Sequence, residues 1–221
     1  MDFDFSPLLE SWQYLLGGLG VTVLLSLAAA VSSIAAGLAV GLLRLYGPAW
    51  LGWLLVFYID SMRAIPVLVV LIWVYFAVPI LTGLSFESFW AALFALTVHL
   101  AAYVAEIFRA GVESIRPGQT RAGLALGMSR GQIVRKILLP QAIVRMLPAF
   151  GSFLSVTIKD TAIAAVIAVP ELMRRAETIA GQSYRPVEVF TTTMVIYFLI
   201  LFPVTRLVDS FYRRVAHLGR S

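Results

Sequence analysis

Five long apolar segments place the strongest constraint on how this chain folds. They cover roughly residues 17–43, 64–81, 89–108, 147–169 and 189–208. A helix needs about 20 apolar residues to cross a bilayer, and each segment comes near or beyond that length. Only 13% of all residues are charged, whereas soluble domains carry about 25%. The sequence therefore predicts an all-α integral membrane protein with five transmembrane helices, folded as a single domain over residues 1–221.

The charge and cysteine content exclude several other classes of protein. The formal net charge is +5, but the arginines do not gather on a soluble face with interleaved aromatic residues, so nucleic acid is not an expected partner. A basic excess in a membrane protein is typical of cytoplasmic loops. The chain has no cysteine, which excludes disulfides and thiol chemistry. The N-terminal sequence MDFDFSPLLE lacks the positive region of a cleaved secretory signal, and we expect it to remain on the protein.

Aromatic residues and a Gly-Pro pair mark the connection between the first two apolar segments. This connection, Arg44–Arg63, reads RLYGPAWLGWLLVFYIDSMR, and Gly47-Pro48 interrupts it near its start. Aromatic rings favour the headgroup level of a bilayer. We therefore expect an amphipathic helix that lies in the membrane interface.

The distribution of basic residues predicts the orientation of the chain. The N-terminal segment carries acidic residues and no basic one, and the first connection is edged by Arg44 and Arg63. The third connection and the tail hold most of the remaining basic residues: Arg109, Arg116, Arg121, Arg130, Arg135, Lys136, Arg145, Arg206, Arg213, Arg214 and Arg220. Because cytoplasmic loops carry the excess of Lys and Arg, the N-terminus is predicted outside and the C-terminus in the cytoplasm.

The segment of residues 159–188 fits this orientation less well, since it would place four basic residues outside the cell or within the bilayer. Four acidic residues match them in number, so we interpret the segment as neutral and internally paired. The eight residues are Lys159, Arg174, Arg175 and Arg185, with Asp160, Glu171, Glu177 and Glu188.

The strip Gly118–Pro140, GQTRAGLALGMSRGQIVRKILLP, is short, basic and rich in glycine. Pro117 before it suits the first turn of a helix, where its missing N–H costs nothing. Residues 119–126 then form a short helix, and Gly127 can adopt the left-handed conformation that ends it. A glycine inside a helix costs about 1 kcal/mol relative to alanine, so Gly123 indicates close packing against another surface.

A second short helix is predicted to follow the first. Ser129 and Gln132 have the spacing of a capping box, and Pro140 is expected to close the helix that they begin. The result is two short helices at an angle on the cytoplasmic side. The residues alone leave two interpretations open: a surface on which another protein docks, or an ordinary loop that the topology keeps basic.

Several motifs in and around this strip resemble the permease subunits of ABC importers, which carry the EAA signature. Ala122-Gly123, Gly127 and the run Ile137-Leu138-Leu139-Pro140 have the spacing of that signature. Further matches resemble the polar amino acid branch of these importers: AYVAEIFRAG (102–111), Gly118-Gln119, LGMS (126–129), LPQA (139–142) and Lys159-Asp160-Thr161. The resemblance covers most of the chain and implies the five-helix permease fold of type I importers.

The resemblance implies that residues 111–140 form a cytoplasmic coupling loop, which docks into a groove on a separate ATPase. Seven residues would form or support this contact: Arg121, Ala122, Gly123, Gly127, Ile137, Leu139 and Pro140. Two of them depart from the signature, since Arg121 replaces its Glu and Gly123 its second Ala. A contact made by that Glu therefore does not carry over to this chain.

The resemblance also implies the other members of the complex. A dimer of ATPase subunits would bind ATP and Mg²⁺, because this chain has no G-x-x-x-x-G-K-[ST] phosphate loop; the chain itself is expected to bind no cofactor and no metal. A second permease subunit, identical or a sister chain, and an extracytoplasmic amino-acid-binding protein would complete the assembly. The chain would then be a non-catalytic transport subunit in the bacterial inner membrane.

Lys159, Asp160 and Thr161 are the candidate residues of the substrate pathway. If the fourth helix begins near Pro148, Lys159 lies about 17 Å along it, near the middle of the bilayer. A charged pair at that depth is costly and usually faces a cavity or a partner, and a broken helix after Asp160 is a device that transporters use. If the helix begins at Ala142 instead, Lys159 reaches the outer interface and forms a local pair with Asp160.

Structural roles are predicted for two other polar features. Glu106 and Arg109 lie three residues apart on one helix face near the cytoplasmic end of the third segment, which favours an ion pair over ligand contact. His99 stands alone in an apolar run. We expect His99 to be packed or hydrogen-bonded, because a proton relay needs a chain of ionisable groups.

Together these features predict a subunit that forms the translocation pathway for polar amino acids. Glu is scarce in the third to fifth segments, which favours acidic or neutral substrates over cationic ones. The alternative is an ion-coupled secondary transporter that acts alone, although the chain lacks the evident internal repeat that such transporters often show. An intramembrane enzyme would need paired carboxylates, a Ser/His pair or a metal cluster within the bilayer, and a chain with two histidines is a poor fit to that class.

Overall fold

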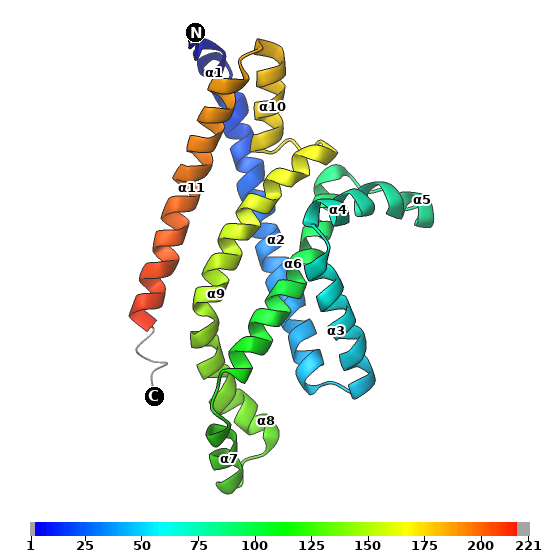
Figure 1. The fold of residues 1–221 in the computed structure, drawn as a ribbon, viewed down its shortest axis with the longest axis vertical. Coiled ribbons are helices and arrows are strands. Elements are labelled where there is room, and N and C mark those ends of the chain that lie inside the picture. Colours follow the sequence, from blue (N-terminus) through cyan, green and yellow to red (C-terminus); the bar gives the residue numbers. More distant parts are fainter. Residues whose placement is uncertain (1–2, 216–221) are drawn as a thin grey trace.

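A computed structural model describes residues 3–215 of the chain, so Asp2 and Arg220, which bear on the predicted topology, lie outside the described part. The elements are α1 (Ser6–Glu10), α2 (Trp12–Tyr46), α3 (Ala49–Ala64), α4 (Val67–Ile72), the π-helical η1 (Trp73–Ala77), α5 (Val78–Thr82), α6 (Ser88–Glu113), α7 (Pro117–Ala125), α8 (Arg130–Ile133), the π-helical η2 (Val134–Leu138), α9 (Leu139–Asp160), the 3₁₀ segment η3 (Thr161–Ile167), α10 (Leu172–Ser183) and α11 (Pro186–Val215). The predicted all-α fold is confirmed. Figure 1 shows an elongated bundle with α10 at one end and α7 and α8 at the other.

Within residues 3–215, four helical stretches are long and apolar enough to cross a membrane, and a fifth crossing would need a bent pair of helices. The four stretches are Trp12–Tyr46, Ser88–Glu113, Arg130–Ile167 and Pro186–Arg214. They correspond to the first, third, fourth and fifth predicted spans. The helix predicted within residues 44–63 is present as α3.

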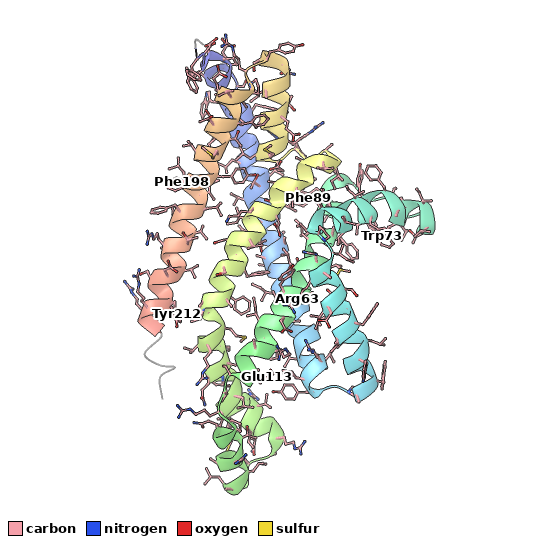
Figure 2. All side chains as sticks on the ribbon, in the orientation of Figure 1. Arg63, Trp73, Phe89, Glu113, Phe198 and Tyr212 are labelled. Atoms are coloured by element: carbon pink, nitrogen blue, oxygen red, sulfur yellow. The ribbon has the colours of Figure 1, made fainter. Side chains whose placement is uncertain are left out.

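The second predicted span, residues 64–81, corresponds to the helical stretch from α4 to α5, Val67–Thr82. This stretch is bent by 106° relative to α3, which precedes it. Pro66 explains the bend, because proline keeps the preceding Ile65 in an extended conformation (φ −89°, ψ 131°) and out of the helical region. The arm from α4 to α5 projects sideways from the bundle (Figure 1), and Figure 2 shows Trp73 on that arm.

Small residues let α2 and α6 pack closely and form the centre of the bundle. A side-chain carbon added at Gly37 would lie 2.6 Å from the carbonyl oxygen of Ala101, and one at Gly41 would lie 2.8 Å from the ring of Phe108. Van der Waals packing drives helix association in apolar surroundings, so such close approaches are stabilising. Most of the small residues of α6 are buried as well: Ala91, Ala92, Ala95, Ala101, Ala102 and Ala105.

Pro140 and Pro148 both lie within one long helical stretch, Arg130–Ile167. The prediction that Pro140 closes a helix is therefore wrong, and neither of the two starts considered for the next helix, Pro148 or Ala142, is one. In the π-helical turn η2, the N–H of Leu139 donates to the carbonyl of Val134, five residues back. This wider turn directly precedes Pro140 and accommodates a residue without an N–H.

The helix type changes after Asp160, where α9 gives way to the 3₁₀ segment η3. With seven residues, η3 is long for a 3₁₀ segment, since such segments have less favourable hydrogen bonds than an α-helix and are usually shorter. Ala168 then takes a left-handed conformation with φ 61°, and the chain turns into α10. At the predicted break after Asp160 the helix therefore changes from α to 3₁₀, and the helical stretch itself continues to Ile167.

Candidate functional site

A cavity of about 760 Å³ lies beside Asp160, between the α3–α4 bend, α6 and α9. Its wall is mostly apolar, and its polar groups belong to Arg63, His99, Tyr103, Ser152 and Asp160. Ligand sites commonly combine this size with an apolar wall and a few polar groups that orient the ligand. Among the described residues that line the cavity, Asp160 supplies the single carboxylate.

The three candidate pathway residues have different surroundings. Asp160 lines the large cavity, whereas Lys159 lines a separate cavity of about 310 Å³ together with Asp209. Thr161 is fully buried, and its hydroxyl donates to the carbonyl of Ile158 at 2.8 Å. Within residues 3–215 no ion pair joins Lys159 to Asp160, so the local pair of the alternative interpretation is not formed: the two side chains line different cavities. The pathway role of the three residues stays a prediction.

His99 lines the cavity beside Asp160, and the apolar sequence around it does not indicate this position. Its side chain is 4% exposed, and its ring centroid lies 5.3 Å from that of Tyr103. In the described part of the chain its Nδ1 has no hydrogen-bond partner, which is uncommon for a buried polar atom. The predicted packing is confirmed, and a bond at Nδ1 is not found. The spacing of four residues between His99 and Tyr103 could have indicated that the two rings are neighbours, because it puts both on one helix face.

A second cavity, of about 570 Å³, continues from the first along α6. The two cavities share Arg63, Tyr103, Ile107 and Ala149 in their walls. The second cavity reaches Ser114, directly after the last turn of α6. The two cavities therefore form a row that runs from Asp160 toward the end of the bundle where α7 begins.

Glu106 is the centre of an ion-pair network that joins three helices. On α6 itself, Nη2 of Arg109 lies 2.5 Å from Oε1 of Glu106. Arg44 of α2 approaches Glu106 to 3.0 Å and Arg63 of α3 to 3.9 Å, and Arg109 also pairs with Glu113. The predicted pair of Glu106 and Arg109 is confirmed. The network is larger than predicted, because two of its arginines come from helices that are distant in sequence.

Replacing Glu106 with glutamine is expected to lower the free energy of unfolding by about 1–3 kcal/mol, the usual cost of leaving charged partners without their hydrogen bonds. The change keeps the shape of the side chain but removes the carboxylate that Arg44 and Arg109 share. Thermal unfolding of the purified protein in detergent measures the effect. Glu113→Gln is the matched control, because Glu113 is 55% exposed and exposed pairs contribute about 0–1 kcal/mol. Equal melting temperatures for the wild type and Glu106→Gln would contradict a stabilising role.

The first helix predicted in the strip 118–140 is present as α7, at the end of the bundle opposite to α10 (Figure 1). It ends in a Schellman motif, in which the N–H of Met128 donates to the carbonyl of Gly123 and the N–H of Gly127 to that of Leu124, both at 3.0 Å. Gly127 has φ +74°, the left-handed conformation that the sequence predicts. The end of the first helix at Gly127 is therefore confirmed.

Ser129 and Gln132 form the predicted capping box at the start of the second helix. The N–H of Gln132 donates to Oγ of Ser129 at 3.3 Å, and the N–H of Ser129 donates to Oε1 of Gln132 at 2.9 Å. This helix packs Ile133 onto Gly123, where an added side-chain carbon would lie 2.8 Å from Cγ1 of Ile133. The packing that Gly123 requires is therefore found within this two-helix segment itself.

The predicted coupling residues lie on both parts of this two-helix segment. Arg121, Ala122, Gly123 and Gly127 lie in α7 or directly after it, and Ile137, Leu139 and Pro140 lie in η2 and the first turn of α9. Arg121 and Ala122 are exposed, and so are the neighbouring large apolar side chains of Leu124 (52%) and Leu126 (80%). Two large apolar side chains are therefore exposed beside the predicted coupling residues.

The charged residues of the segment 159–188 are only partly paired with one another. Two ion pairs form within it, each at 3.4 Å: Arg174–Glu177 and Arg185–Glu188. Arg175 instead donates to the carbonyl of Tyr14 at 2.7 Å and lies over the ring of that residue, while Glu171 accepts from backbone N–H groups. The predicted one-for-one pairing is therefore wrong: backbone groups and an aromatic ring satisfy the charges of Arg175 and Glu171, while Lys159 and Asp160 line different cavities.

Comparison with protein families matches residues 13–217 to the family described as "Binding-protein-dependent transport system inner membrane component". The chain belongs to this family. Its resemblance to importer permeases is thus confirmed. This permease is 35% identical over 221 residues to the glutamine transport system permease protein GlnP of Escherichia coli (strain K12), across 97% of this chain and 99% of the relative. It is 33% identical to the arginine transport system permease protein ArtQ of Bacillus subtilis (strain 168), across 93% and 94%.

Solved structures have the same fold as this permease. One, described as an amino acid ABC transporter with histidines, is 32% identical and has a TM-score of 0.91 over 97% of this permease and 100% of that chain. Another, an inward-facing MetNI methionine ABC transporter, has a TM-score of 0.81 over 93% of this permease and 98% of that chain, with 23% identity. The second likeness concerns the fold alone.

Proposed function

We propose that this permease forms the translocation pathway for polar amino acids in an ATP-driven importer and transmits the motion of a separate ATPase to that pathway. The observation that carries the proposal is the row of two cavities from Asp160 along α6 toward α7. It connects a charged group inside the bundle with the end that holds the coupling residues. The relatives are named for glutamine, for glutamate and aspartate, and for arginine, which supports an amino acid as cargo.

The polar groups of the large cavity suit the two charged ends of an amino acid. The carboxylate of Asp160 can accept hydrogen bonds from an α-ammonium group, and the guanidinium of Arg63, 41% exposed, can donate to a carboxylate. With one carboxylate among its described lining residues, the cavity has little to hold a second positive charge. Acidic or neutral amino acids are therefore the proposed cargo.

The end of the bundle that carries α7 and α8 is proposed to lie in the cytoplasm and to dock on the ATPase. The arginines of this end follow the positive-inside bias, which puts the N-terminus outside and the C-terminus in the cytoplasm of a bacterial inner membrane. The exposed side chains of Leu124 and Leu126 would enter an apolar groove of the ATPase. ATP and Mg²⁺ are then bound by the ATPase dimer, because this chain has no phosphate loop.

Two more partners complete the proposed complex. A second permease, identical or a sister chain, would close the pathway from the other side. An extracytoplasmic amino-acid-binding protein would approach from outside. Because α10 lies at the end of the bundle opposite to α7 (Figure 1), that end is the one the binding protein would contact.

Reconstitution distinguishes this importer from an ion-coupled secondary transporter that acts alone. Liposomes are prepared with the permease, a candidate ATPase and a binding protein, with ATP inside, and the uptake of radiolabelled glutamine, glutamate and arginine is measured. We expect accumulation that requires ATP, persists with an uncoupler, and is greater for glutamine or glutamate than for arginine. Liposomes with the permease alone are the control. Uptake by the permease alone that an uncoupler abolishes would contradict the proposal and favour the secondary transporter.

A further inference from the structure

Glu171 is a fully buried carboxylate at the joint between η3 and α10. Four donors converge on it: the backbone N–H groups of Met173 (2.9 Å) and Arg174 (2.6 Å), and the hydroxyls of Thr22 (3.3 Å) and Tyr197 (3.2 Å). The two N–H groups begin α10, whereas Thr22 belongs to α2 and Tyr197 to α11. One carboxylate thus ties three helices together.

Hydrogen bonds hold Glu171 in place, and within residues 3–215 it forms no ion pair. Burial raises the pKa of this carboxyl, and its bonds to the N–H groups of Met173 and Arg174 oppose that effect. Arg175, four residues further on, directs its guanidinium to the carbonyls of Pro170 (3.0 Å) and Tyr14 (2.7 Å) instead. Hydrogen bonds weaken steeply when their angles change, so this carboxylate is sensitive to the position of each donor.

Thr22 extends this joint from α10 to the start of η3. Its hydroxyl accepts a hydrogen bond from the N–H of Leu172 at 3.0 Å. One turn later on α2, the hydroxyl of Ser26 donates to the carbonyl of Thr22 at 2.7 Å and lies 3.4 Å from the hydroxyl of Thr161. Thr161 directly follows Asp160 in the chain. The helix α2 therefore holds both ends of the connection between η3 and α10.

Close backbone packing makes the joint rigid. A side-chain carbon added at Gly18 would lie 3.0 Å from Cα of Leu172 and 3.1 Å from the carbonyl oxygen of Glu171, so α10 rests directly on α2. The side chains of Glu171, Leu172 and Thr161 are each 0% exposed. Buried hydrogen bonds to the carboxylate favour one defined arrangement. The hydroxyls of Ser26 and Thr161 donate to the carbonyls of Thr22 and Ile158, so these two side chains meet in a packing contact. We define Glu171, Leu172 and Thr161, with Thr22, Ser26 and Tyr197, as the Glu171 junction.

We propose that Glu171 is a positioning residue through which a displacement of α10 reaches Asp160. A movement of α10 carries Glu171 with it and shifts Thr22 on α2. Ser26, one turn away, then shifts against Thr161. This changes the position of Asp160 at the end of α9. The inference rests on the proposed function only for the consequence at Asp160, since the mechanical link itself does not depend on what is transported.

A distance measurement tests the mechanical link. The chain has no cysteine, so spin labels attach only where Val31→Cys on α2 and Val166→Cys on η3 place them, at positions 68% and 58% exposed. Pulsed electron resonance is recorded on the labelled full chain in its complex, in lipid nanodiscs and diluted with unlabelled complex. We expect a narrow distance distribution in the wild type. Glu171→Gln, which keeps the side-chain shape but removes the carboxylate, is expected to broaden it.

A transport measurement in liposomes tests the consequence at Asp160. Glu171→Gln and Ser26→Ala are each expected to reduce ATP-dependent uptake of radiolabelled glutamine roughly 2- to 30-fold, the range of couplings carried by such networks. The double variant should show no lower uptake than the single variant with the larger loss, because both changes break the same link. Thr193→Val is the matched control: Thr193 is equally buried, but its hydroxyl donates only to Val189 of its own helix.

Two outcomes would each overturn the proposal. Unchanged distances and uptake in Glu171→Gln would overturn it, as would single effects that multiply in the double variant. If Glu171→Gln fails to assemble, Tyr197→Phe, which removes one bond to the carboxylate, takes its place and is expected to broaden the same distribution. If the wild-type complex transports no amino acid, the proposed function fails, while the distance measurement still decides whether the Glu171 junction fixes η3 on α2.

Discussion

Replacing Asp160 with asparagine is expected to reduce amino-acid uptake by about 10- to 150-fold, which corresponds to the 1.5–3 kcal/mol of a hydrogen bond to a charged group. Asp160 supplies the single carboxylate among the described residues that line the large cavity. The substitution removes its charge and preserves its size, so a bound α-ammonium loses its counter-charge while the cavity keeps its shape. Uptake of radiolabelled glutamine into liposomes that contain the full complex measures the effect.

The control for this prediction is a second aspartate of the same chain. Asp60 is exposed on α3, and it does not line the cavity beside Asp160. Asp60→Asn should therefore transport at the wild-type rate. Both variants should retain their ATPase subunit during purification, which shows that assembly is intact. Normal uptake by Asp160→Asn would remove Asp160 from the pathway, and loss of the ATPase would show that the residue supports assembly instead.

The features that the sequence predicts correctly depend on neighbours along the chain. Gly127 ends α7 because glycine accepts the left-handed conformation without strain, and Ser129 caps the next helix through Gln132, three residues away. The pair of Glu106 and Arg109 spans a single turn of α6. In each case the interacting groups are fixed by a local backbone geometry that the residue types already specify.

The features that the sequence does not predict depend on contacts between distant segments. Arg44 and Arg63 join Glu106 from other helices, and no local spacing indicates this. Pro140 is tolerated because a π-helical turn precedes it, and residue types do not specify where such a turn forms. His99 is placed on the cavity wall by the packing of α6 against α9 and the α3–α4 bend, which apolar periodicity describes only as burial.

Replacing Gly127 with leucine is expected to separate ATP hydrolysis from uptake. Gly127 adopts φ +74°, and a left-handed conformation costs an L-residue with a side chain about 1–2 kcal/mol. If the turn between α7 and α8 opens to relieve this strain, the arrangement that docks on the ATPase becomes about 5- to 30-fold less populated. The number of ATP molecules hydrolysed for each amino acid imported should rise by a similar factor. Simultaneous measurement of phosphate release and uptake in liposomes gives this ratio.

Gly131 provides the control that isolates the backbone effect at Gly127. Both glycines are exposed and an added side-chain carbon would meet no atom at either one, but Gly131 does not share the positive φ of Gly127. Gly131→Leu should therefore keep the wild-type ratio of hydrolysis to uptake. If both leucine variants raise the ratio equally, bulk on this surface, and not the turn, controls the contact with the ATPase. If Gly127→Leu keeps the wild-type ratio, the bend between α7 and α8 does not transmit the motion, because the strained turn would then change nothing that the ATPase detects.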